Sequence, residues 1–131
     1  MSPLSDPDVD AWLAAFSACV RARDLDGGRE LFASEAVGFG TVTERYEGLD
    51  DLVASQWSEV WERTEEFTFL DGDQRWIDGD QAVVAAAWRS VGTDGGGRRT
   101  RTGRVTLVLR RQGAAVLALH SHFSMSPGTP A

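Results

Sequence analysis

Two histidines near the C-terminal end have the residue type and spacing of metal ligands. His120 and His122 are the only histidines of the chain, and residues i and i+2 of a strand lie on one face of a sheet. Two imidazoles can bind a metal together, but no carboxylate stands at ligand spacing and Cys19 is the only cysteine. We therefore predict no metal and no cofactor. We interpret the histidines as structural residues of an interface, with pH sensing there as an alternative.

Arg104 is the charged residue that we predict to bind an anion. If it points inward together with Thr106 and Ser121, it can bind a carboxylate, a phosphate or an enolate oxygen. The alternative is a solvated arginine at a strand edge, and the simple alternation of apolar residues along this strand favours that orientation. Glu44, in a loop, is the best available general base. Arg104 and Glu44 are thus the two catalytic candidates.

Aromatic residues recur in every predicted element and could form either a pocket wall or a packed core. Trp61 and Trp88 are the two that we expect most strongly in a pocket, because a helix end and a strand middle can both reach its mouth. The full predicted ligand pocket consists of Phe16, Phe39, Trp57, Trp61, Trp88, Arg104, Thr106, Ser121 and Phe123.

Hydrophobic periodicity predicts three helices followed by strands. The helices are expected at residues 7–23, in a short segment from residue 24, and at residues 49–63, with a short strand at 37–42 before the last one. Longer strands are expected at 67–77, 81–91, 99–110 and 114–125. This order indicates an α+β fold in which a curved antiparallel sheet packs over three N-terminal helices.

The last two strands predict a dimer. With a tight turn at Gln112-Gly113, Thr106 would face Leu119, and both faces of the hairpin would be largely apolar. An antiparallel sheet with one wet face should instead alternate cleanly. We therefore predict that helices cover one face and that a second subunit covers the other. The expected dimer face contains Leu107, Leu109, His120 and His122.

Composition limits the class of protein. A chain of 131 residues suits one domain, 1–131, with an ordered core from about 7 to 127. The net charge of −7 argues against nucleic acid and anionic membranes as partners. Residues 1–8 contain no basic, apolar leader, and no disulfide framework is possible, so we expect a cytoplasmic protein.

Three segments resemble the nuclear transport factor 2-like superfamily in its SnoaL-like branch, which is related to the ketosteroid isomerases. Residues 24–33 resemble the link between its first two helices, residues 39–48 the segment before its third helix, and residues 120–127 the last strand of a kinase association domain. The resemblance implies a cone, in which a curved sheet closes over helices around a pocket, and a dimer through the outer sheet face.

The resemblance also limits the chemistry. Phe16 and Gly40 stand where ketosteroid isomerases have their catalytic tyrosine and aspartate, so that mechanism is not expected here. Trp88, Thr106 and Phe123 occupy the positions that match the ligand-binding arginines of the association domain. None of them is an arginine, so the same ligand chemistry is not expected. Two hypotheses remain. One is a protein that binds a small apolar or partly anionic molecule and acts on it by acid–base isomerisation, cyclisation or dehydration. The other is a non-catalytic ligand-binding or dimerisation module.

Overall fold

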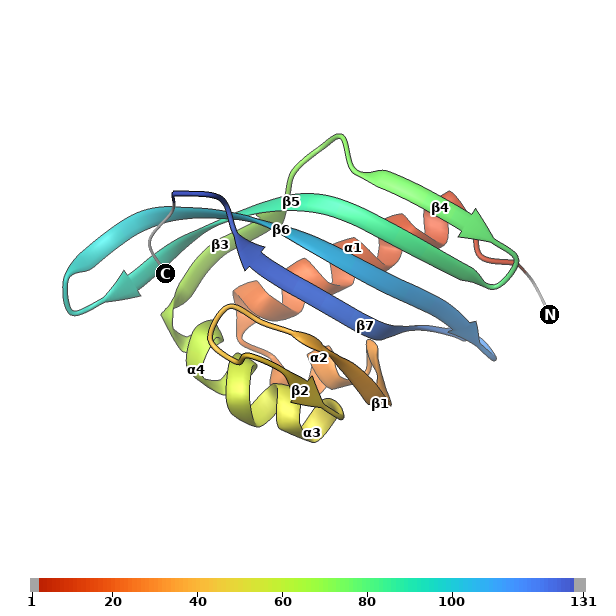
Figure 1. Cartoon of the computed structure of the whole chain (residues 1–131), viewed down its shortest axis with the longest axis horizontal. Coiled ribbons are helices and arrows are strands. Elements are labelled where there is room, and N and C mark those ends of the chain that lie inside the picture. The colour runs from red at the N-terminus through yellow and green to blue at the C-terminus, as the bar shows by residue number, and fades with distance from the viewer. Residues whose placement is uncertain (1–2, 129–131) are drawn as a thin grey trace.

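The computed structural model describes residues 3–128, and its helices precede most of its strands (Figure 1). Residues 129–131, beyond the predicted ordered core, lie outside the described residues. The helical part comprises α1 (Asp6–Ala22), α2 (Leu25–Arg29), α3 (Leu49–Leu52), a π-helical turn (Val53–Trp57), α4 (Ser58–Val60) and a 3-10 turn (Trp61–Arg63). The strands are β1 (Phe32–Phe39), β2 (Tyr46–Glu47), β3 (Thr64–Phe69), β4 (Gln74–Asp78), β5 (Gln81–Asp94), β6 (Gly97–Gln112) and β7 (Ala115–Met125).

All seven strands form one curved sheet, and the helices lie on its concave side (Figure 1). The strand order is β2-β1-β7-β6-β5-β3, and β4 pairs with the remaining part of the same β5 edge. The predicted α+β class is confirmed. The predicted curved sheet over the N-terminal helices is present, and it is antiparallel except at one pair, because β1 runs parallel to β7. The strand expected at 67–77 is in fact two strands, β3 and β4, on successive parts of β5.

Helix α1 begins one residue earlier than its proline suggests. Ser5 is the N-cap, and its side chain and that of Asp8 form a reciprocal capping box. Before it, Leu4 is only 4% exposed and its amide donates to the carbonyl of Gly79. The ordered chain therefore begins before residue 7. No helix among residues 3–128 is long and apolar enough to cross a bilayer.

An ion-pair cluster fastens α1 beneath the sheet. Arg75 of β4 contacts the carboxylates of Asp6, Asp10 and Asp73 at 3.2, 2.5 and 2.6 Å. The Arg75 side chain is only 17% exposed, so these contacts are less screened by water than surface pairs are. The cluster holds the buried stripe of α1 against the concave face.

The pairing of β6 with β7 differs from the predicted register. The turn lies at Gly113 and Ala114, since Gln112 pairs with Ala115. A bulge at Leu119 then shifts the register by one more residue, because Leu109 pairs with Ala118 but Val108 pairs with His120.

This register decides which residues share a face. On the concave face Val105 pairs with Phe123, and Leu107 pairs with Ser121. Leu107 and Leu109 are fully buried core residues, so their assignment to a dimer face is wrong. Arg104 and Thr106 lie on the convex face with His120 and His122. Their predicted inward orientation is therefore also wrong.

Candidate functional site

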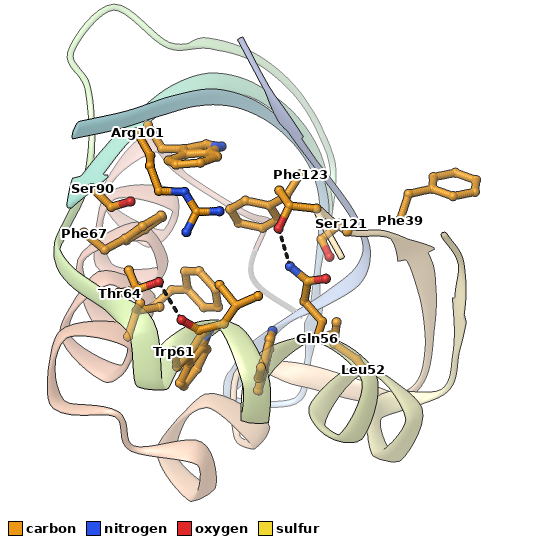
Figure 2. A pocket seen from close by; sticks show the side chains of 17 residues that line it. Phe39, Leu52, Gln56, Trp61, Thr64, Phe67, Ser90, Arg101, Ser121 and Phe123 are labelled. Carbon is orange, nitrogen blue, oxygen red and sulfur yellow. Dashed lines mark hydrogen bonds between the residues drawn. The ribbon is translucent and has the colours of Figure 1, made fainter. Parts of the chain in front are cut away.

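A cavity opens between the concave face of the sheet and the helical segment of residues 49–63 (Figure 2). Its free space is about 580 Å³ with the open mouth included, and the centre of a water molecule can move through about 50 Å³ of it. The walls are mostly apolar, with seven aromatic side chains and six polar ones, as in small-molecule sites. The lining residues are Phe16, Val20, Phe39, Gly40, Thr41, Leu52, Gln56, Trp57, Val60, Trp61, Thr64, Phe67, Trp88, Ser90, Arg101, Ser121 and Phe123.

The aromatic walls come from both layers of the fold. Trp57 and Trp61, on the helical side, stack with ring centroids 4.5 Å apart. Trp88 and Phe123, on the sheet side, have centroids 6.4 Å apart. Trp88 lies over Gly103, where an added Cβ would come within 2.2 Å of the indole ring. The glycine is thus required for the tryptophan to lie flat against the sheet at the cavity wall.

Arg101 of β6 extends its guanidinium into this aromatic cavity (Figure 2). Its stem crosses Gly92, where an added Cβ would lie 2.4 Å from its Cδ. The nearby Arg98 and Arg99 pair with Glu65, Glu66 and Asp94. In contrast, Arg101 has neither an ion pair nor a side-chain hydrogen bond with any residue in 3–128. A half-buried cation in an apolar cavity therefore lacks a counterion within the described chain.

The electrostatic surroundings of Arg101 favour an added negative charge. Burial lowers the pKa of Arg101, and the positive charges of Arg63 and Arg99 lower the pKa further. Asp94 opposes this shift only as the smallest contribution. An anion placed at Arg101 would offset both the lost hydration and the repulsion between the arginines.

Ser90 adds a hydroxyl beside this cation. It pairs with Arg101 across β5 and β6, and it is 2% exposed. Its side chain makes no hydrogen bond within residues 3–128, although its position at the cavity leaves the hydroxyl reachable. Arg101 and Ser90 together form the polar group on one side of the cavity.

Gln56 organises the opposite side. It lies in the π-helical turn, a feature frequent at functional sites. Its Oε1 accepts from the amides of Val42 and Thr43 at 2.9 and 3.0 Å, and its Nε2 donates to Thr41 Oγ1 at 2.7 Å. Gly40 makes room for this amide, since a Cβ there would lie 2.4 Å from Oε1. The loop at the cavity mouth is thereby held in one conformation.

Ser121 lines the cavity from β7 and is supported from behind by Tyr46. Tyr46 Oη lies 2.7 Å from Ser121 Oγ and accepts from the Ser121 amide at 3.1 Å. Tyr46 is fully buried, and burial raises the pKa of its phenol, although its hydrogen bonds with Ser121 act in the opposite direction. Gly38 leaves space for the ring, because a Cβ there would lie 2.7 Å from the phenol oxygen.

Most of the predicted pocket residues do line this cavity: Phe16, Trp57, Trp61, Trp88, Ser121 and Phe123. Phe39 borders it, but its ring points away (Figure 2) and packs on His122 with centroids 5.0 Å apart. Arg104 and Thr106 are exposed on the convex face, outside the cavity. Glu44 is exposed in its loop and is not a lining residue.

The polar residues of the site that sequence reasoning missed are Thr41, Tyr46, Gln56, Thr64, Ser90 and Arg101. The signal for Arg101 was present, because the alternation of Val105, Leu107 and Leu109 toward the core extends back through Gly103 to Arg101. The predicted register, which lacks the bulge at Leu119, instead placed Arg104 on the concave face. The carbonyl of Arg104 does contribute to the site indirectly, by accepting from Trp88 Nε1 at 3.2 Å.

The two histidines lie apart from the cavity, on the convex face. His120 Nδ1 is 2.9 Å from the carbonyl oxygen of Val37, and both imidazoles contact the ring of Phe39. Within residues 3–128, no three histidine, cysteine or acidic side chains converge as metal ligands.

Comparison with known proteins places this fold in a family. A family model for the SnoaL-like domain matches residues 9–127. The chain belongs to the SnoaL-like domain family. No curated protein sequence matches it. The SnoaL-like assignment therefore rests on the family model, and it agrees with solved structures that share the fold.

Three of these structures illustrate how varied the assigned roles are. A candidate calcium/calmodulin-dependent protein kinase II association domain from Xanthomonas campestris has a TM-score of 0.81 at 18% identity, over 98% of this chain and 96% of that one. A nuclear transport factor 2-like superfamily protein from Salmonella enterica has a TM-score of 0.80 at 17% identity, over 95% of this chain and 93% of that one. A candidate dehydratase from Streptomyces avermitilis has a TM-score of 0.79 at 15% identity, over 93% of this chain and 96% of that one. Identities this low establish the shared fold alone.

Gly103→Ala tests the packing that builds the sheet-side wall. The added Cβ would lie 2.1 Å from the Ser124 carbonyl oxygen and 2.2 Å from the Trp88 ring. We expect the free energy of unfolding to fall by about 1–3 kcal/mol in urea denaturation, as in other overpacked sites. Gly95→Ala, in the turn of the same hairpin with no atom within 4 Å of the added Cβ, is the control. Equal stability of the two variants would contradict the described wall.

Proposed function

We propose that this SnoaL-like protein binds a small aromatic carboxylate in the cavity between sheet and helices. The observation that carries the proposal is the guanidinium of Arg101, which extends without a counterion from the described chain into an aromatic cavity. Arg101 would pair with the carboxylate, and Ser90 would donate to the same group. The aromatic body would lie among Trp61, Trp88 and Phe123.

Electrostatics supports an anion as the ligand. Moving a charge out of water costs free energy unless a partner compensates, and guanidinium matches the planar geometry of a carboxylate. The chain as a whole carries a net charge of −7, so its overall electrostatic field would repel an anion. Attraction of an anion to Arg101 would therefore come from the local positive charges of Arg101, Arg63 and Arg99, and not from the net charge of the chain.

The lining supports binding over acid–base catalysis. Among its 17 residues, Arg101 is the only one with an ionisable carboxyl, imidazole, amine, thiol, phenol or guanidinium group. Isomerisation, dehydration and cyclisation by proton abstraction require a base within reach of the substrate. Glu44, the base considered from sequence, is exposed in a loop and does not line the cavity. We therefore favour a binding protein.

Arg101→Met tests this proposal by isothermal titration with 4-isopropylbenzoate. We expect the dissociation constant to rise about 10- to 100-fold, because a charge-assisted hydrogen bond is lost while the apolar wall remains. The neutral 4-isopropylbenzamide should bind the two proteins within a factor of about three of each other. Arg104→Met, three residues along the same strand but on the convex face, is the matched control and should bind the acid as wild type does.

Three results would overturn the proposal. One is binding of 4-isopropylbenzoate that is unchanged in Arg101→Met. Another is a wild-type protein that does not bind this acid at millimolar concentration. Loss of binding in Arg104→Met to the same extent would also count against it, because that side chain does not reach the cavity.

A homodimer through the convex face is a second proposal, favoured by exposed apolar side chains there. The strand register places Trp76, Val83, Val108, His120 and Val37 in one row across β4, β5, β6, β7 and β1. Trp76 is 60% exposed and Val37 is 44% exposed, which is unusual for large apolar side chains on a sheet. A second copy of the chain would cover this row.

Val108→Glu tests the dimer, because Val108 lies at the centre of the row. We expect light scattering to give about twice the mass of one chain for wild type and one chain mass for the variant, since two carboxylates would be buried at the interface. The control is Val42→Glu, which changes an exposed valine in a loop outside this row and should leave the protein dimeric. A wild-type protein with the mass of one chain at micromolar concentration would exclude the dimer.

A further inference from the structure

The available hydrogen-bond partners of Tyr46 determine which hydroxyl donates in its bond with Ser121. The phenol of Tyr46 is fully buried, and within residues 3–128 its only partners are the amide and the hydroxyl of Ser121. The amide is a donor and cannot accept. If Ser121 donated to Tyr46, the phenol hydrogen would have no acceptor, at the cost of an unsatisfied buried donor. Tyr46 therefore donates to Ser121 Oγ.

This direction leaves the hydrogen of the Ser121 hydroxyl without an acceptor in the described chain. Ser121 is 2% exposed, and its side chain lines the cavity. Buried hydroxyls in native proteins nearly always find a partner. A buried donor that faces a cavity is thus a place for an acceptor atom of a ligand.

The position of this donor complements Arg101. In Figure 2, Ser121 and Gln56 lie on the opposite side of the cavity from Arg101 and Ser90. Thr41, whose Oγ1 accepts from Gln56 Nε2, adds a second hydroxyl to the side of Ser121. A ligand that spans the cavity therefore meets a cation at one end and hydroxyl donors at the other, with aromatic rings between them.

We propose that the ligand is an aromatic keto acid, whose ketone oxygen accepts from the Ser121 hydroxyl while its carboxylate pairs with Arg101. Tyr46 is a positioning residue, since it touches Ser121 and not the ligand. This inference rests on the proposed function, because it describes the other end of the same ligand. A carbonyl suits the site better than a hydroxyl because Ser121 already accepts the phenol hydrogen and has its own hydrogen to donate.

Tyr46 keeps its hydrogen under ordinary conditions. Burial raises the pKa of the phenol above its usual value, which already lies near 10. The orientation of Ser121 should therefore not change with pH between about 6 and 8.

The experiment compares matched acids that differ only at the acceptor. The probes are 2-, 3- and 4-acetylbenzoate and 4-acetylphenylacetate, each paired with its isopropyl analogue of nearly equal shape. We expect wild type to bind at least one keto acid about 3- to 10-fold more tightly than its isopropyl partner, as a neutral hydrogen bond would give. In Ser121→Ala this ratio should fall to about one, with the isopropyl acids bound as before. Ser121→Thr, which keeps the hydroxyl, should restore the preference.

Tyr46→Phe tests the positioning role. The preference for the keto acid should fall part of the way toward one, since the Ser121 hydroxyl is kept but can rotate. Near-ultraviolet circular dichroism and unaltered binding of the isopropyl acids would show that the variant is folded. Infrared spectra give a second readout, because the ketone stretch of the bound acid should shift to lower frequency in wild type and not in Ser121→Ala.

The outcomes separate the two proposals. If the isopropyl acids bind in an Arg101-dependent way but no keto acid is preferred, the keto-acid inference is wrong and the proposed function stands. A preference that is equal in wild type and Ser121→Ala also overturns the inference. If no acid of either kind binds wild type, both proposals fall together.

Discussion

The fold depends on one buried ring, Phe16, where helix and sheet meet. Its centroid lies within about 6 Å of seven other aromatic rings, which come from α1, β1, the helical segment before β3, β3 itself and β7. Helix α1 is held for this contact by Arg75 at one end and by Arg21, which donates to the Phe67 carbonyl at 2.9 Å, nearer the other. Phe16 thereby forms the floor of the cavity.

The cavity above that floor exists because the sheet curves. It also depends on glycines at the two positions where large side chains lie across a neighbouring strand. Gly92 and Gly103 leave room for the Arg101 stem and the Trp88 ring. Arg98 ties the same hairpin of β5 and β6 to Glu65 and Glu66 of β3, near a bulge where Glu66 adopts a φ of 57°. The hairpin is thus bent over the helical segment, and this brings Arg101 inside. A charge on a flat sheet of the same sequence pattern would remain in solvent.

Sequence reasoning could predict the fold class and the aromatic walls, because both follow from periodicity that is local along the chain. It could not predict the register of β6 and β7. The run Leu117, Ala118, Leu119 is apolar throughout, so nothing in its composition marks Leu119 as the bulged residue. Because the bulge was not predicted, Arg104 was assigned to the concave face and Arg101 was not recognised as a cavity residue. Gln56 was visible as a polar residue in an otherwise apolar helical stripe. The contact of Tyr46 with Ser121, 75 positions apart, depends on the parallel pairing of β1 with β7, which no local pattern encodes.

The most direct measurement of the central claim is a crystal structure of the protein with 4-bromobenzoate, in which anomalous scattering locates the bromine independently of the model. We expect the bromine among the aromatic side chains of the cavity and a carboxylate oxygen within about 3 Å of the Arg101 guanidinium. A bromine found only outside the cavity, or a bound ring whose carboxylate does not contact Arg101, would contradict the claim that Arg101 is the anion site.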